Sequence, residues 1–202
     1  MKEQAIASYI EAATVLAQLS SDAREALDRL FAGEGSGGGA RLEKMLTARL
    51  LERRKQAATE YTPTPIDRPL PDFRVTTLSG QEVASRRLRG RPAIINVWAA
   101  WCFSCMIELP WLDEFQRTHR DLTVLAVAWS SKLEDVRKIR EQKKLNALHV
   151  AVSDALEREL GDSGVPTTFV VDRKGRIRFV HNDLPDVMAV LDKDLAYLAA
   201  EK

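Results

Sequence analysis

The sequence has only two cysteines in 202 residues, which excludes a small fold held together by several disulfides. It has no apolar run approaching the roughly 18 residues of a membrane-spanning helix. Its charges nearly cancel, with 30 Lys and Arg against 29 Asp and Glu, so a large nucleic-acid-binding surface is not expected. The first residues, MKEQAIASYI, lack the apolar core of a signal peptide. We therefore expect either a cytosolic protein or a chain that begins after a removed signal.

The composition changes twice along the chain. Residues 1–60 carry apolar residues at steps of three and four, which predict three helices, with a break at the Gly-rich run GEGSGGGA at 33–40. Residues 61–71 are rich in proline, which favours a semi-rigid spacer or a strap over the next domain. Residues 72–202 alternate apolar strand patterns with amphipathic helix patterns. We predict a helical N-terminal segment (1–60), a linker (61–71) and an α/β domain (72–202).

The α/β region contains several buried-type strands. The run PAIINVWAA at 92–100 is continuously apolar, which is typical of a strand covered on both faces. A helix pattern at 102–119 follows it, and a second apolar run occupies 122–129. Two further strands flank the turn Asp172–Arg173–Lys174–Gly175. This order of elements predicts a three-layer α/β fold.

The two cysteines, Cys102 and Cys105, stand three residues apart at the start of the predicted helix. Residues at this spacing share one helix face, so their sulfurs can bond. The free N–H groups and the partial positive charge of a helix N-terminus stabilise a thiolate. We therefore expect the Cys102 thiolate to attack a substrate disulfide and Cys105 to resolve the mixed disulfide.

Other uses of this cysteine pair fit the sequence less well. A zinc site needs further ligands, but there is no third cysteine, and His119, His149 and His181 are scattered. Covalent haem needs a histidine after the second cysteine, where Met106 stands. A peroxiredoxin would need a cysteine in the pattern P-x-x-x-T-x-x-C, which the sequence lacks. Two inert core cysteines are the remaining alternative, which the adjacent tryptophans and the helix start disfavour. No metal site and no cofactor are expected.

Two motifs extend this interpretation. NVWAAWCFSCMIELP (96–110) and GVPTTFVVDRKGRI (164–177) resemble the thioredoxin superfamily, and within it the TlpA/ResA-like thiol–disulfide oxidoreductases. The resemblance covers about residues 70–200. It implies a central mixed sheet flanked by helices, with an active-site loop that faces a cis-proline loop.

The resemblance also implies roles for individual residues. Pro166 matches the family's cis-proline, and the backbone of the preceding Val165 would pair with a substrate strand; the alternative is a trans proline that opens an edge strand. Glu108 matches the acidic residue of C-x-x-C-x-x-E-x-P and would relay a proton; the alternative is an exposed helix glutamate. Trp101 would cover the sulfurs and contribute to the docking surface, whereas Trp98 is expected in the core.

The chain also departs from thioredoxins proper. They carry a buried aspartate six residues before the first cysteine, where this chain has Asn96, and this agrees with the TlpA/ResA-like branch. The dipeptide between the cysteines, Phe103–Ser104, leaves the reduction potential open. Trp129 is expected at a strand end in the core, with a place in the substrate groove as the alternative.

We expect a thiol–disulfide oxidoreductase that reduces disulfides in exported proteins. Its partners would be protein thiols and disulfides and an upstream thiol redox protein. One alternative is a disulfide oxidase or isomerase dimerised through residues 1–60; another is a non-catalytic thioredoxin-fold binding module. The resemblance implies a periplasmic or otherwise extracytoplasmic location. The basic stretch RRLRGR at 86–91 is expected to be a solvated loop, with an acidic partner as the alternative.

Overall fold

The computed structural model describes residues 48, 52, 56, 58–161, 164–182 and 186–201. Contacts divide the chain into two units, residues 1–59 and 60–202. The described residues between 48 and 60 are helical. Most of the predicted N-terminal helical segment, with its Gly-rich break at 33–40, lies outside the described residues and stays a prediction.

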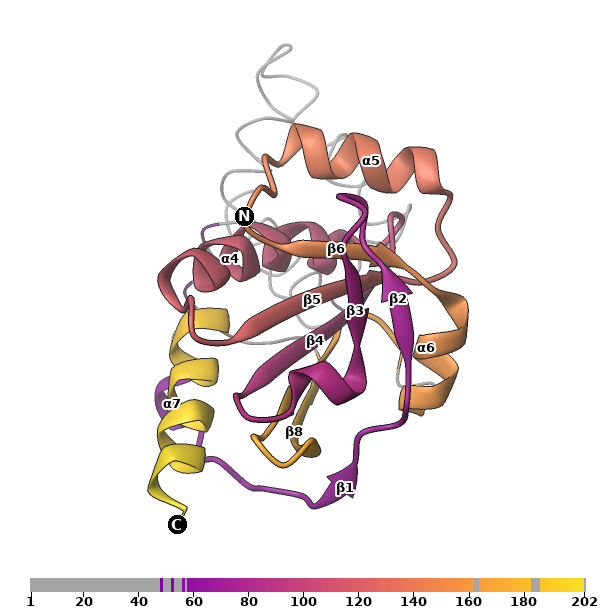
Figure 1. The fold of residues 1–202 in the computed structure, drawn as a ribbon. Coiled ribbons are helices and arrows are strands. Elements are labelled where there is room, and N and C mark those ends of the chain that lie inside the picture. Colours follow the sequence, from indigo (N-terminus) through magenta and orange to yellow (C-terminus); the bar gives the residue numbers. More distant parts are fainter. Residues whose placement is uncertain are drawn as a thin grey trace, which may run out of the picture. The chain divides into compact units, whose positions relative to one another are not determined.

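The second unit is an α/β domain in which strands and helices follow one another along the chain (Figure 1). Its strands are β1 (Arg68–Pro69), β2 (Arg74–Thr76), β3 (Glu82–Ala84), β4 (Ala93–Trp98), β5 (Thr123–Ala128), β6 (His149–Val152), β7 (Thr167–Val171) and β8 (Arg176–Asn182). Its helices are the 3-10 turn η2 (Ser85–Leu88), α4 (Phe103–Thr118), α5 (Leu133–Gln142), α6 (Asp154–Leu160) and α7 (Val187–Ala200).

Six strands form one mixed sheet in the order β1-β8-β7-β4-β5-β6. β4, β5 and β6 are parallel, whereas β7 and β8 run antiparallel to their neighbours. The β2–β3 hairpin is a separate two-stranded sheet that meets β6 through a bridge between Thr77 and Ala151. This topology confirms the predicted mixed sheet flanked by helices, a thioredoxin-like fold.

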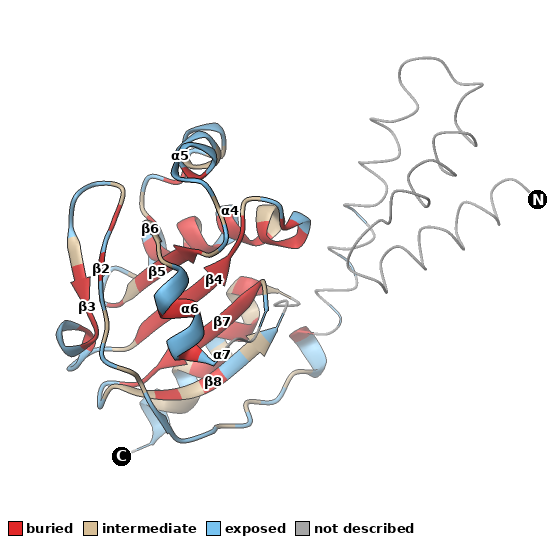
Figure 2. Cartoon of the chain, turned by 90° about the vertical axis from the view of Figure 1, so that its right-hand side faces the viewer, coloured by how far each residue is buried: buried red, intermediate tan, exposed pale blue. Residues whose placement is uncertain are grey.

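Burial is greatest in the central strands (Figure 2). All six residues of β4 are buried, as expected of a strand covered on both faces. On one face, α6, the β2–β3 hairpin and η2 pack in a common core cluster with β4, β5 and β7. On the other side of the sheet, α4 and α7 contact each other. The predicted core position of Trp98 is confirmed, because its side chain is completely buried.

The Pro-rich segment 61–71 runs along the outer edge of the sheet. β1 pairs antiparallel with β8, and the backbone N–H of Ile66 donates to the carbonyl of Arg178 at 2.7 Å. Asp67 forms an ion pair with Arg176. At the start of the segment, the Tyr61 hydroxyl donates to the buried Asp194 of α7 at 2.5 Å. In the structure this segment is a strap bound to the domain.

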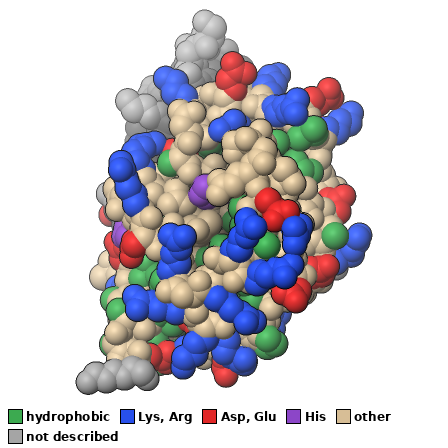
Figure 3. All heavy atoms as spheres, viewed as in Figure 1, with side chains coloured by type: hydrophobic (Ala, Val, Ile, Leu, Met, Phe, Trp, Pro, Cys, Tyr) green, Lys and Arg blue, Asp and Glu red, His purple; other side chains and the backbone are tan. Residues whose placement is uncertain are grey.

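The basic stretch 86–91 lies on the surface of the domain. Arg86, Arg87, Arg89 and Arg91 are exposed, and Arg87 lies 4.0 Å from Glu82. Figure 3 shows Lys and Arg side chains gathered over the lower part of one face, with fewer acidic groups among them. This agrees with a solvated loop and does not test the alternative of an acidic partner.

Candidate active site

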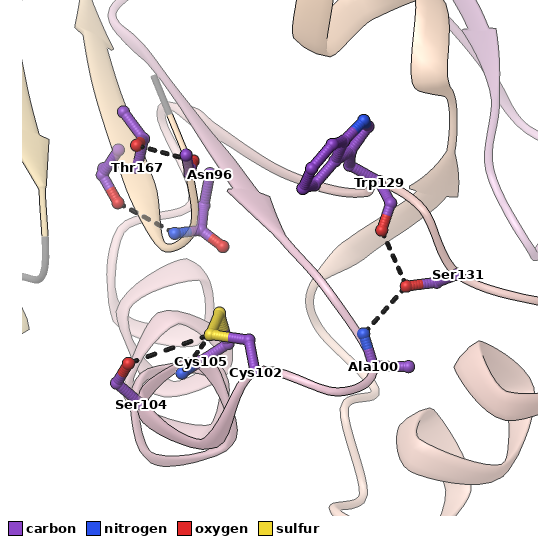
Figure 4. The surroundings of a disulfide bond; sticks show 10 residues. Asn96, Ala100, Cys102, Ser104, Cys105, Trp129, Ser131 and Thr167 are labelled. Carbon is purple, nitrogen blue, oxygen red and sulfur yellow. Dashed lines mark hydrogen bonds between the residues drawn. A yellow bond between two sulfur atoms is a disulfide. The ribbon is translucent and has the colours of Figure 1, made fainter. Parts of the chain in front are cut away.

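The two cysteines lie where β4 leads into α4 (Figure 4). They form a disulfide with a Cα–Cα distance of 5.3 Å. Cys102 is the N-cap residue of α4, and its sulfur accepts a hydrogen bond from the backbone N–H of Cys105 at 3.2 Å. Such amides at a helix N-terminus stabilise a negative charge on the first sulfur. Cys102 is 4% exposed and Cys105 is 1% exposed, so both residues are buried in the oxidised pair.

The loop before Cys102 is held by the loop that follows β5. The Ser131 hydroxyl accepts from the backbone N–H of Ala100 at 2.8 Å and donates to the carbonyl of Trp129 at 2.8 Å (Figure 4). The indole N–H of Trp101 donates to the Ser130 carbonyl at 3.2 Å. These bonds fix the Cys102 backbone relative to β5. The sequence analysis did not single out Ser130 or Ser131. The feature that could have pointed to them is their position at the carboxyl end of a buried parallel strand next to β4.

Two tryptophans, one of them next to Cys102 in the chain, pack against each other. Trp101 is 57% exposed, and its ring meets that of Trp129 edge to face, with centroids 6.0 Å apart. Trp129 is partly buried and also packs against the core cluster. Its packing agrees with the core position expected for it, and the alternative of a place in the substrate groove stays a prediction. The exposed face of Trp101 lies next to Cys102 in the chain and is available for contact with another molecule.

The peptide bond between Val165 and Pro166 is cis, as the resemblance implies. The next residue, Thr167, pairs with Val97 at the carboxyl end of β4. The sheet register therefore brings this loop to the same end of the sheet as the cysteines. Val165 is partly buried against the core cluster.

The polar residues below the disulfide are buried. The Asn96 side-chain amide donates to the Thr168 hydroxyl at 2.9 Å, so the position of the thioredoxin aspartate holds a neutral, hydrogen-bonded group. Glu108 lies one turn after Cys105 in α4 and is 1% exposed. The alternative of an exposed helix glutamate is therefore wrong. The burial follows from the position of Glu108 on the same side of α4 as Leu109 and Leu112, which are also buried.

A family model described as the AhpC/TSA family matches residues 66–180, more than half of the chain. The chain belongs to the AhpC/TSA family. Within the family, it is 30% identical over 139 residues to the thiol:disulfide interchange protein DsbE of Xylella fastidiosa (strain 9a5c), covering 66% of this chain and 70% of that protein. It is 28% identical over 123 residues to the thiol–disulfide oxidoreductase ResA of Geobacillus thermodenitrificans (strain NG80-2), covering 59% and 71%.

Solved structures show the same architecture in AhpC/TSA-like chains. A thioredoxin-family thiol:disulfide interchange protein from Chlorobium tepidum TLS matches with a TM-score of 0.54 and 26% identity, over 66% of this chain and 97% of that one. The exposed lipoprotein thioredoxin Etrx1 of Streptococcus pneumoniae TIGR4 matches with a TM-score of 0.57 and 22% identity, over 62% and 99%. The predicted thioredoxin-like, ResA-like resemblance is confirmed. This family member is an oxidoreductase of the thiol–disulfide class.

Proposed function

We propose that this chain reduces disulfides in protein substrates by exchange with the Cys102–Cys105 pair. The observation that carries the proposal is the placement of the pair: Cys102 caps α4 at the carboxyl end of β4, and the cis-Pro166 loop joins the same end of the sheet. The names of the relatives, thiol:disulfide interchange protein DsbE and thiol–disulfide oxidoreductase ResA, are consistent with a reductase. An oxidase, an isomerase and a non-catalytic module have no comparable support.

The exchange has two steps. In the reduced protein, the Cys102 thiolate attacks one sulfur of the substrate disulfide, forms a mixed disulfide and releases the other substrate sulfur as a thiolate, which takes a proton. The Cys105 thiol then loses its proton and attacks Cys102. The Cys102–Cys105 disulfide forms, and the second substrate sulfur leaves as a thiol. The substrate gains two electrons, which an upstream dithiol must return to the protein.

One hydrogen bond supports Cys102 as the nucleophile. Its sulfur accepts the backbone N–H of Cys105 at the start of α4, so its thiolate is the stabilised one. Cys105 lies inside the first turn of α4 and is buried. This arrangement supports attack by Cys102 and resolution by Cys105.

Three neighbouring residues would each have a separate role in this exchange. Glu108, which is buried one turn after Cys105 in α4, would accept the Cys105 proton during resolution. The backbone of Val165, before Pro166, would pair with an extended substrate strand beside the disulfide. Trp101 would cover the substrate with its exposed ring.

Two cysteine variants test the chemistry. Cys102→Ser should abolish reduction of a protein disulfide such as that of insulin, because the attacking thiolate is missing. Cys105→Ser should accumulate mixed disulfides, visible on a non-reducing gel, because the resolving thiol is missing. Full activity in Cys102→Ser would contradict the proposal.

The direction of exchange is tested by the reduction potential of the pair in glutathione buffers. A value near or below about −250 mV supports a reductase, whereas a value above about −180 mV indicates an oxidase or isomerase.

We also propose an extracytoplasmic location, supported by the absence of any cysteine outside the disulfide. Fractionation of source cells would test it. No helix among the described residues is both long enough and apolar enough to cross a membrane.

A further inference from the structure

Arg68, in β1 of the strap, contacts the segments on both sides of the cis-Pro166 turn. Its guanidinium group donates a hydrogen bond to the carbonyl of Leu160, the last residue of α6, at 2.9 Å. The same group lies over the ring of Phe169 in β7, with 5.7 Å between its central carbon and the ring centroid. Leu160 precedes Pro166 in the chain and Phe169 follows it. One side chain therefore joins the segment that leads into this turn to the segment that leaves it.

Gly161 allows Arg68 to come this close to α6. Gly161 ends the helix in a left-handed conformation with φ 108°, which glycine adopts without strain. A Cβ atom at this position would lie 3.2 Å from a terminal nitrogen of Arg68, so a side chain there would crowd the guanidinium group. The last carbonyls of a helix have no partner within the helix, and a cation at this end also complements the helix dipole. The contact is therefore favourable both as a hydrogen bond and as a charge interaction.

The strap has other contacts that hold it on the sheet. The backbone N–H of Ile66 donates to the carbonyl of Arg178 at 2.7 Å, and Asp67 forms its ion pair with Arg176. These contacts join the strap to β8, whereas the side chain of Arg68 reaches α6 and β7. Arg68 is itself exposed, so its substitution removes no side chain from the core.

The cis-Pro166 turn is held differently on its two sides. After the turn, Thr167 pairs with Val97 of β4, and its hydroxyl donates to the carbonyl of Gly164 at 2.9 Å. Before the turn, the chain comes from the end of α6, where Arg68 binds. An extended substrate can pair with the Val165 backbone only where that backbone lies at the right distance from the disulfide. A shift of about 1 Å can lower the rate of a reaction by about a hundredfold.

We propose that Arg68 is a positioning residue, which sets the position of the Val165 backbone by holding the end of α6 against β7. The inference rests on the proposed function, because it concerns the binding of the polypeptide that the cysteine pair reduces. The bond that favours the thiolate is a backbone bond at the start of α4, where Arg68 makes no contact. Loss of Arg68 should therefore slow exchange with a polypeptide and spare exchange with a disulfide that has no backbone to pair with Val165.

The test uses the full chain, reduced beforehand and freed of reductant, so that no upstream donor is needed. It is mixed with an uncharged disulfide-linked peptide that has four residues on each side of its cysteine, or with the small uncharged disulfide dithiodipyridine. The second-order rate constant for each is measured for wild type, Arg68→Met and Arg176→Gln. Methionine keeps an apolar chain over Phe169 but cannot donate to the Leu160 carbonyl. Arg176→Gln is the matched control, because it breaks the ion pair with Asp67 in the same strap.

We expect Arg68→Met to lower the rate constant for the peptide about tenfold. The rate constant for dithiodipyridine should stay within about twofold of wild type, which also shows that the cysteine site is folded. Arg176→Gln should keep both rate constants. An unchanged peptide rate in Arg68→Met, an equal loss with both disulfides, or a tenfold loss of the peptide rate in Arg176→Gln would overturn the role of Arg68 alone. Failure of wild type to reduce either disulfide would overturn the proposed function as well.

Discussion

At the scale of single residues, one hydrogen bond supports Cys102 as the attacking residue in the proposed exchange. The Cys105 amide donates to the Cys102 sulfur, and a backbone N–H at a helix N-terminus stabilises a thiolate. Removal of the Cys105 proton is a separate step of the proposed exchange, because Cys105 is buried. We propose that Glu108, equally buried and one turn further along α4, accepts this proton.

Glu108→Gln separates the two steps of exchange. Glutamine keeps the shape of the side chain and cannot accept the proton, so we expect resolution of the mixed disulfide to slow by about tenfold to a hundredfold. The pH dependence of this step should flatten, whereas a role in packing alone would leave the pH profile unchanged. Stopped-flow measurement of resolution between pH 5 and 9 tests this. Attack by Cys102, measured in the Cys105→Ser background, is the control and should be unchanged.

Residue patterns predicted the cysteine pair and Trp98 but not the loop that holds them. The C-x-x-C spacing and the apolar run before it are local signals. Ser130 and Ser131 form no local motif of this kind. Ser130 adopts a left-handed backbone with φ 44° and acts through its carbonyl, so its side chain gives no signal in the sequence. The burial of Glu108 was also uncertain, since charged residues occur all round a helix of this composition and only tertiary packing decides which face is covered.

At the scale of elements, α4 has two structural roles. Its N-terminus positions the two cysteines, and its buried face packs on the domain. The helix continues through Pro110 without ending. The strap 61–71 is the other element with a structural role, because it covers the outer edge of β8, which would otherwise present unpaired backbone groups.

The strap depends on a carboxylate. The Arg176 guanidinium holds the pKa of Asp67 below its ordinary value. Because the pKa of Asp67 is lower in the folded protein than its unfolded value near 4, the ion pair adds stability to the folded state above that pH. This stability is lost as the pH falls through the lower, folded-state pKa. We expect hydrogen exchange at the Ile66 and Leu70 amides to accelerate several-fold below pH 4, after correction for intrinsic rates.

Arg176→Gln should remove this acid dependence, because the ion pair with Asp67 is then missing at every pH. Arg74→Gln is the matched control: it breaks an exposed pair with Glu82 at 2.7 Å in the β2–β3 hairpin and should leave exchange in the strap unchanged. Exchange in the strap that does not respond to acid in wild type would contradict the role of Asp67.

The strap also shows where sequence patterns stop being informative. Strands β4 and β5 were predictable because each lies in a largely apolar run, and β7 and β8 because they flank the turn at residues 172–175. β1 is only Arg68–Pro69 within a Pro-rich stretch, a composition typical of linkers. Proline is tolerated there because an edge strand has one side free of ladder hydrogen bonds. Its pairing depends on Arg176 and Arg178, more than 100 residues away.

At the scale of the whole molecule, the chain joins a complete thioredoxin-like domain to an N-terminal unit that ends at Thr59. The sequence of residues 1–60 carries apolar stripes that bury little area by themselves, so we predict that they associate with a second copy or another partner. Catalysis as proposed needs only the second unit.

Analytical ultracentrifugation tests this prediction. The full chain should sediment above its monomer mass of 22.6 kDa, and residues 58–202, which retain Tyr61 and its bond to Asp194, should sediment as a monomer. The shorter chain should keep its rate of disulfide reduction. A monomer in both cases would contradict self-association and would also count against a dimeric isomerase.

The strap has a consequence for how the chain is made. Asp67 and Arg176 are 109 residues apart, so a ribosome working at 5–20 residues per second needs about 5–20 seconds to deliver the partner of the strap. During that interval residues 61–71 have emerged and β8 has not been synthesised. The sheet can be closed only after nearly the whole domain has left the exit tunnel. A nascent chain stalled before residue 176 would still hold β7 in the tunnel and would leave β4, the partner of β7, as an open edge exposed to chaperones.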